Sequence, residues 1–244
     1  MDTFRSILIA LLMAPLAALG QAYPSKPVRM VVPFAAGGMM DTVARAMGNR
    51  LSEAIGQPVV IDNRGGGGGT IGADIVAKAA PDGYTVALTG GPPHGVYPFF
   101  IKNVPFDTIK DFSPIIIFGT APQVLVAHPS LPVSSVKELI DYAKKNPGKL
   151  SYGTSGIGSP HHLGGLLLNR AAGIDMVHIA YKGGGPALID VLGGQLPVAM
   201  LALSTVVPHV RSGKLRLLAV LEAQRAKAVP DTPTIAEFGY PGYA

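Results

Sequence analysis

A glycine turn that joins a short apolar run to an amphipathic helix constrains this chain more than any other feature. Residues 29–32 predict a buried strand, because they are mostly apolar and end before Pro33. From Asp41 onward, apolar side chains recur at helical spacing, which predicts a helix with one buried face. Asp41 or Thr42 is expected to cap that helix with a side-chain oxygen. The turn itself is Phe34-Ala35-Ala36-Gly37-Gly38-Met39-Met40.

Several backbone N–H groups converge at such a junction, which suits an anion such as a carboxylate. The same residues are equally compatible with a tight turn that binds nothing. A second turn of this type follows a predicted strand at residues 150–153: residues 154–160 form a glycine loop, and an apolar helix comes after it. Two such turns fit two lobes that face one ligand cleft.

Strand and helix signals alternate along the chain, which favours parallel α/β architecture with ligands bound beyond the carboxyl ends of the strands. Ser135 and Glu138 have the spacing of a capping box, and Pro186 is expected at the first position of a helix. Further strands are predicted at residues 59–62, 84–89, 115–118, 124–127, 176–180, 197–203 and 215–221.

Composition excludes several classes of protein. The chain has no cysteine, which removes zinc–thiolate sites, iron–sulfur clusters, thiol nucleophiles and disulfides. Its net charge of +5 comes from scattered Lys and Arg, and tryptophan is absent, so nothing indicates a nucleic-acid interface. The histidines lack metal-ligand spacing, and His178, within an apolar run, is expected to be a satisfied core histidine. We therefore expect no metal and no cofactor.

The first 22 residues resemble a cleavable signal peptide. Arg5 precedes an apolar run at residues 7–19, and Gly20-Gln21-Ala22 offers small residues at the cleavage site. An uncleaved anchor remains the alternative, because Asp2 offsets Arg5. No other stretch is long and apolar enough to span a bilayer, so the mature chain is expected to be exported and not embedded in the membrane.

One cofactor-binding motif and one catalytic motif are each matched only in part. Gly67, Gly69 and Gly72 have the spacing of a dinucleotide fingerprint, but no acidic residue follows at residues 84–93 to hold a ribose. Ser155 lies in a sequence similar to a nucleophile elbow, although Ile157 replaces the second glycine. His161 or His162 would have to fold back to act as its base. An exported serine hydrolase therefore stays as an alternative function.

Motifs along the whole mature chain closely resemble Bug-type solute receptors, the periplasmic substrate-binding proteins of tripartite tricarboxylate transporters. The matching segments are Tyr23-Pro24-Ser25-Lys26-Pro27-Val28-Arg29, Val31-Val32-Pro33-Phe34 with Gly37-Gly38 and Asp41, Gly56-Gln57-Pro58-Val59-Val60, Asn63-Arg64, Gly72-Ala73, Ala77-Lys78-Ala79-Ala80-Pro81-Asp82-Gly83-Tyr84-Thr85, Lys110-Asp111-Phe112, Asn146-Pro147-Gly148-Lys149-Leu150, His178-Ile179-Ala180-Tyr181-Lys182-Gly183, Leu192-Gly193-Gly194-Gln195 and Pro230-Asp231-Thr232-Pro233-Thr234.

The resemblance implies a type II periplasmic-binding fold, with two α/β lobes around a ligand cleft, and no catalysis. It implies a first lobe at residues 23–121, a second at 122–226, and a return of residues 227–244 to the first. It also implies a periplasmic monomer that binds a small organic carboxylate and serves inner-membrane transporter subunits. The expected ligand-binding residues are Phe34, Ala36, Gly37, Gly38, Met39, Asp41, Gly67, Thr89, Gly90, Thr154, Ser155, Gly156, Ser159, His161 and Ala202.

Three departures from the family pattern matter. Ala35-Ala36 replaces a frequent proline, with Met39-Met40 adding apolar bulk, and Leu201-Ala202-Leu203 stands where the family often has a polar residue. Both changes suggest a less polar ligand or a drier site. Family members also usually continue for several tens of residues beyond a segment like Pro241-Gly242-Tyr243, which predicts a truncated chain that folds or binds weakly. A non-functional fragment is therefore a third interpretation.

Overall fold

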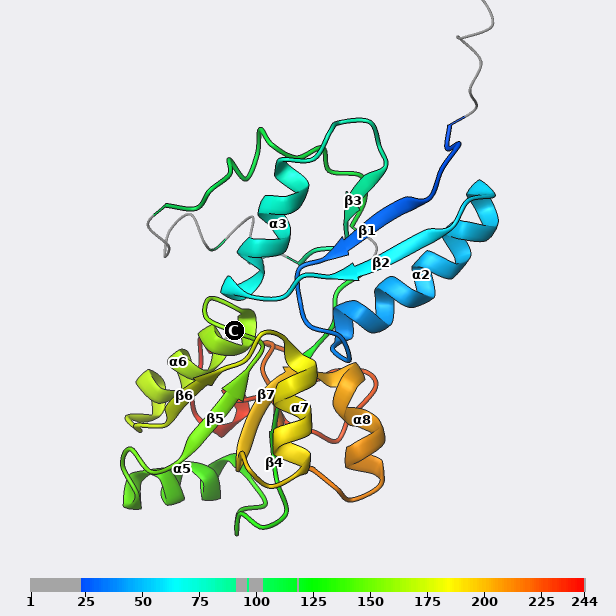
Figure 1. Ribbon diagram of the computed structural model, residues 1–244. Helices are drawn as coiled ribbons and strands as arrows, with labels where there is room; N and C mark the ends of the chain where they lie inside the picture. Colours follow the sequence, from blue (N-terminus) through cyan, green and yellow to red (C-terminus); the bar gives the residue numbers. More distant parts are fainter. Residues whose placement is uncertain (1–22, 91–95, 97–102, 118, 244) are drawn as a thin grey trace, which may run out of the picture.

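The structure is a computed structural model that describes residues 23–90, 96, 103–117 and 119–243. The expected signal peptide at residues 1–22 lies outside the described residues. Within the described ranges, no helix has both the length and the apolar character needed to cross a membrane. Two α/β lobes are stacked, with β1–β3 in the upper one and β4–β8 in the lower one (Figure 1).

The first lobe is built on a three-stranded parallel sheet with the order β2-β1-β3. Its strands are β1 (Val28–Val32), β2 (Val59–Asn63) and β3 (Thr85–Ala87). Helix α2 (Met39–Ile55) packs its apolar stripe against β1 and β2, while α3 (Thr70–Ala77) follows the short 3-10 helix η2 (Gly67–Gly69). Met30, Val32, Ala44 and Leu88 form the buried core between sheet and helix.

The second lobe has a five-stranded mixed sheet with the order β6-β5-β7-β4-β8. The strands are β4 (Gln123–Ala127), β5 (Ser151–Thr154), β6 (Val177–Ala180), β7 (Val198–Ala202) and β8 (Arg216–Val220). The helices are α5 (Val136–Lys145), α6 (Pro160–Ala172), α7 (Gly184–Leu192) and α8 (Leu203–Arg211). One apolar core includes buried residues of α5 and α6, and the other those of α7 and α8.

The capping predicted before α5 is confirmed at its N-cap, Ser135, while the carboxylate of Glu138 bonds to the residue before the N-cap. Ser135 Oγ accepts a hydrogen bond from the N–H of Glu138 at 3.2 Å, and the Glu138 carboxylate accepts one from the N–H of Ser134 at 2.7 Å. The first bond satisfies an N–H group that the first helical turn leaves unpaired, and the second fixes the chain just before the helix. The apolar face of α5 is buried, as the spacing of its apolar residues predicts.

Two predictions about local structure are wrong. Residues 115–117 form no strand, and Ile115, Ile116 and Ile117 are 83%, 72% and 90% exposed. A short apolar run predicts a strand only if a neighbouring strand pairs with it, and the described residues supply none. Pro186 is the third residue of α7, not the first, because Gly184 and Gly185 already have helical hydrogen bonding.

The segment after β8 belongs to the second lobe, which corrects the expectation that residues 227–244 return to the first. Thr234 bridges to Val220 of β8, and Ile235 is fully buried in the second lobe's core. Tyr243 is 4% exposed and donates a hydrogen bond from its hydroxyl to the Gly164 carbonyl of α6 at 2.9 Å. These long-range contacts leave no trace in the local sequence pattern, so sequence reasoning missed them.

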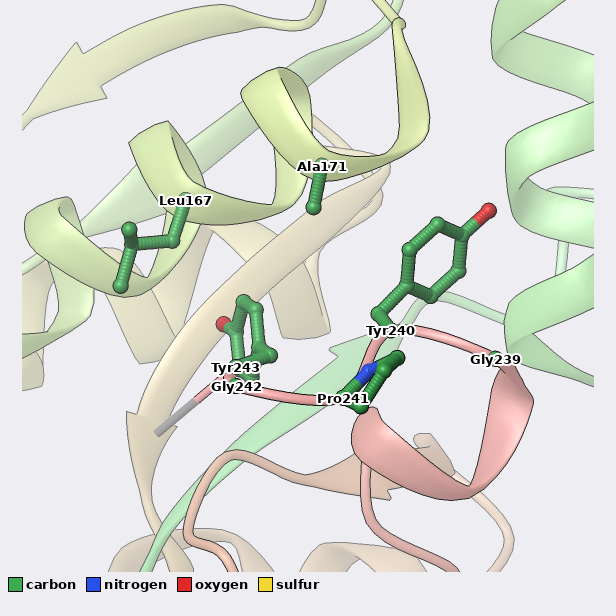
Figure 2. A pocket seen from close by; sticks show the side chains of 7 residues that line it. All are labelled: Leu167, Ala171, Gly239, Tyr240, Pro241, Gly242 and Tyr243. Atoms are coloured by element: carbon green, nitrogen blue, oxygen red, sulfur yellow. The ribbon is translucent and has the colours of Figure 1, made fainter.

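A pocket of about 300 Å³ lies between this C-terminal segment and α6. Figure 2 shows Leu167 and Ala171 on the helix, with Tyr240, Pro241 and Tyr243 opposite them. All of its lining residues belong to the second lobe.

Candidate ligand-binding site

The turn between β1 and α2 lies at the boundary between the lobes. Gly38 is the N-cap of α2 and no side chain caps the helix, so neither Asp41 nor Thr42 has the expected capping position. Asp41 is instead the third helical residue, and its carboxylate reaches back to accept the N–H of Gly37 at 3.0 Å and Nε of Arg45 at 3.1 Å. An acidic side chain at the third helical position that accepts a backbone N–H near the helix start resembles the acidic residue of a capping box.

Asp41 therefore holds the turn in shape. Its side chain is 7% exposed, and it also forms an ion pair with Arg45 at 3.0 Å. Burial by itself raises the pKa of Asp41, but hydrogen bonds from Arg45 and Gly37 outweigh it and keep the pKa below its ordinary value. The carboxylate is thus ionised and engaged by its own loop, which makes Asp41 a positioning residue.

Other N–H groups of the same turn are left for a ligand. Within the described residues, the amides of Ala36 and Gly38 have no hydrogen-bond acceptor; Ala36 is exposed, whereas Gly38 is buried where Gly184 and Gly185 of the second lobe pack on it. They lie at the N-terminus of a 17-residue helix, where unpaired N–H groups and the helix dipole favour an anion. Asn63 steadies the turn by donating from Nδ2 to the Phe34 carbonyl at 3.1 Å.

The glycine run at residues 65–69 packs where backbones approach closely. A Cβ on Gly65 would lie 2.6 Å from the carbonyl oxygen of Lys182, in the other lobe. A Cβ on Gly72 would lie 2.6 Å from Cα of Pro33, so α3 also needs a glycine to pack there. Of the three glycines that match a dinucleotide fingerprint, close packing thus explains Gly72, while Gly67 and Gly69 have φ of +57° and +109°, which favour glycine.

The loop between β5 and α6 is the second predicted site segment. Ser159 is the N-cap of α6, where its Oγ accepts the N–H of His162 at 3.2 Å and donates to the Gly156 carbonyl at 2.7 Å. Gly156 donates its N–H to Thr154 Oγ1 at 3.2 Å and has φ +130°, which favours glycine. A Cβ on Gly156 would lie 3.4 Å from Cα of Gly68, so this loop meets the first lobe.

Ser155 and His161 are brought together by this loop. Ser155 Oγ lies 2.7 Å from Nδ1 of His161, and both residues are buried. Burial lowers the pKa of His161 to about 4, so the ring is neutral at neutral pH. Its Nε2 is buried with no hydrogen-bond partner among the described residues. The pair brings together the two residue types that the hydrolase alternative requires.

Other features of the pair disfavour a catalytic role. In the described part of the chain, no carboxylate contacts His161, so the acid that orients the base in a serine hydrolase is lacking. Both side chains are also more than nine-tenths buried, which restricts access to a substrate. The contact instead ties the start of α6 to the end of β5.

Two further histidine rings contact the loop between β5 and α6 and stabilise its conformation. His162 and His178 stack with their centroids 4.1 Å apart, and His178 Nε2 lies 2.6 Å from Thr154 Oγ1. His162 Nδ1 accepts the N–H of Gly158 at 3.1 Å. Burial and the neighbouring His162 lower the pKa of His178 to about 4. His178 is hydrogen-bonded and partly buried, and the described ranges contain no cluster of three metal-ligating side chains.

The remaining predicted residues lie at the carboxyl ends of strands. Thr89 and Gly90 follow β3 and are half-buried, and Ala202 ends β7 with 4% exposure. Met39 is the first residue of α2, and Gly67 lies in η2 with φ +57°. The predicted residues thus gather at the facing edges of the two sheets, where α/β folds bind ligands.

Sequence reasoning missed the segment at residues 182–185. The N–H of Ala35 donates to the carbonyl of Lys182 at 2.9 Å, a hydrogen bond that joins the two lobes. Gly183 and Gly185 are buried against the first lobe. The sequence does contain a third strand–glycine–helix pattern here. Because the helix was predicted to start at Pro186, the glycines before it were interpreted as a turn with no role in the site.

Comparison with known proteins identifies the family. A family model described as "Tripartite tricarboxylate transporter family receptor" matches residues 43–244. The chain belongs to this receptor family. Protein BugT of Bordetella pertussis is 39% identical over 231 residues, which cover 94% of this chain and 70% of that protein. A second protein of the same organism is 39% identical over 237 residues, covering 96% of this chain and 72% of its own length.

Solved structures agree with the lobe architecture. The periplasmic binding protein BugD has a TM-score of 0.86 and 39% identity, covering 91% of this chain and 74% of that one. A Rhodopseudomonas palustris protein solved with adipate matches with the same TM-score, identity and coverage. MatC of the same organism, with bound malate, has a TM-score of 0.85 and 34% identity, covering 91% and 75%. The resemblance to Bug-type receptors and the two-lobed α/β fold are both confirmed.

Proposed function

We propose that this receptor binds a small carboxylate between its lobes in the periplasm, for tripartite-tricarboxylate-type uptake or sensing, and that it catalyses no reaction. The observation that carries the proposal is the unpaired amide of the exposed Ala36, next to the unpaired amide of the buried Gly38. They lie at the start of α2, in the turn that meets the second lobe. An exported monomer with a cleaved signal peptide at residues 1–22 is part of the same proposal.

The site residues divide into three roles. Ala36, Gly38 and Met39 offer backbone N–H groups at the first lobe's helix start. Asp41 and Ser159 hold the two loops in shape through the contacts described above. The other expected residues, at the strand ends and glycine turns, would surround the ligand. They are Phe34, Gly37, Gly67, Thr89, Gly90, Gly156 and Ala202. The buried Thr154, Ser155 and His161 would instead hold the second loop in shape.

A dicarboxylate is the first ligand to test. The similar proteins solved with adipate and malate hold two-carboxylate ligands of different polarity. Leu201 and Leu203 are buried in the core of the second lobe, but Ala202 ends β7 without a polar side chain, which favours the aliphatic chain of adipate over hydroxylated malate. Adipate is therefore the ligand that we expect to bind more tightly.

A thermal-shift titration of the chain from Tyr23 onward tests the proposal. A ligand that binds only the native state raises the melting temperature as its concentration rises. We expect a shift with adipate, a smaller one with malate and none with adipamide, which has the same length but no charge. Shifts of equal size with adipamide would overturn the carboxylate assignment. The non-functional fragment interpretation predicts no cooperative melt at all.

A further inference from the structure

The lobes touch through backbone atoms at residues 35–38 on one side and residues 182–185 on the other. The Ala35–Lys182 hydrogen bond lies at this contact. A Cβ on Gly185 would lie 2.3 Å from the Ala36 carbonyl oxygen and 3.1 Å from the N–H nitrogen of Gly38. Real Cβ atoms do not approach a carbonyl oxygen this closely, so only glycine allows the observed contact at this position.

Position 185 needs a glycine because of the atoms packed against it, and not because of its own backbone conformation. It is the second residue of α7, and its φ lies outside the left-handed region. An alanine there would suit the helix, since alanine has the highest helix propensity. The atoms that Cβ would meet most closely all belong to the first lobe: the Ala36 oxygen, the Gly37 carbonyl carbon and the Gly38 nitrogen. Once the lobes separate, those atoms move away.

We propose that Gly185 is the closure contact of this receptor, the position at which the start of α7 seats on the Ala36–Gly38 turn and sets how far the lobes close. This contact between α7 and the Ala36–Gly38 turn covers the turn that we assign to the ligand. Closure of the lobes should therefore slow release of the ligand. This inference rests on the proposed function for the ligand, but the contact itself does not depend on which ligand binds.

Gly193 supplies a matched control at the other end of the same helix. A Cβ on Gly193 would lie 3.4 Å from the Ile189 carbonyl and 3.9 Å from that of Asp190, both within the second lobe. Its φ of −80° accepts alanine. Gly185→Ala and Gly193→Ala therefore make the same chemical change in one helix, and only the first meets the other lobe.

Distance measurement between spin labels tests closure directly. The chain has no cysteine, so Arg50→Cys on α2 and Lys145→Cys on α5 place one label on each lobe at exposed positions. In the parent with these labels, we expect a short-distance population that grows with adipate. Gly185→Ala should lose most of that population, and Gly193→Ala should keep it. Circular dichroism melts should show that both variants fold.

Adipate affinity provides the second measurement. Because the apparent affinity falls with the fraction of protein that reaches the binding-competent closed state, Gly185→Ala should bind roughly tenfold more weakly or worse. Gly185→Ser, with a larger side chain, should bind at least as weakly. Equal distance distributions and equal affinities in Gly185→Ala and the parent would overturn the closure contact. If the parent binds no carboxylate but Gly185→Ala still reduces the closed population, the proposed ligand fails and the contact stands.

Discussion

Ser155 Oγ and His161 Nδ1 lie 2.7 Å apart and join the end of β5 to the first turn of α6. The nitrogen that faces the serine is Nδ1, which leaves Nε2 buried and unpartnered within the described residues. In a serine hydrolase the serine meets Nε2, and an acid holds Nδ1. The contact is thus the reverse of a catalytic pair, and it positions a loop.

Ser155→Ala separates the receptor from the hydrolase. We expect roughly a three- to tenfold loss of adipate affinity by calorimetry, the effect of one hydrogen bond in the supporting loop. The parent protein should show no turnover of p-nitrophenyl acetate beyond the buffer rate. Ester hydrolysis by the parent that disappears in Ser155→Ala would establish the enzyme instead.

Buried His161 makes the protein lose stability in acid. The unfolded chain protonates this ring below pH 6.5, but the folded protein does so only near pH 4. Between these values the unfolded state binds more protons, so the free energy of unfolding falls as the pH falls, by roughly 3 kcal/mol for this group. His178 acts in the same direction.

Urea titrations at pH 7, 5.5 and 4.5 measure this loss. His161→Asn keeps a polar atom near the Nδ1 position and has no ring to protonate, so its stability should depend less on pH over the same window. An unchanged slope in that variant would assign the acid sensitivity to other groups.

Asp41→Asn tests the positioning role of the first loop. It removes the ion pair with Arg45 and weakens the bond from Gly37, which should lower the free energy of unfolding by roughly 1–3 kcal/mol. Asp74→Asn is the matched control, because Asp74 forms an i,i+4 pair with Lys78 on α3 that should contribute less than about 1 kcal/mol. Equal losses in thermal melts of the two variants would contradict the role of Asp41.

Tyr243→Phe tests the docking of the C-terminal segment on the second lobe. It removes the hydroxyl that donates to Gly164 and should cost about 0.5–1.5 kcal/mol, the net contribution of one hydrogen bond, because the Gly164 carbonyl keeps its hydrogen bond within α6. Tyr240→Phe, on the rim of the pocket in Figure 2, should change the melting temperature little. Limited proteolysis should release the last residues faster from Tyr243→Phe than from Tyr240→Phe.

Local signals in the sequence predicted the elements that local physics determines. The strand before Pro33, the N-cap at Ser135 and the two glycine turns all depend on residues close in the chain, and the structure has each of them. Contacts between distant residues were missed. The burial of Tyr243 against Gly164 depends on segments 79 residues apart, and the Ala35–Lys182 bond depends on how the lobes meet.

The unequal sheets of the two lobes have a consequence for how the molecule opens. Within the described part of the chain, three strands covered by a small core build the first lobe, and five strands with an apolar core on each face build the second. Amide protons of β1–β3 should therefore exchange with solvent faster than those of β4 and β7. A solute held at the start of α2 would slow exchange chiefly in the less stable lobe, so the hydrogens of β1 would record whether the receptor is occupied.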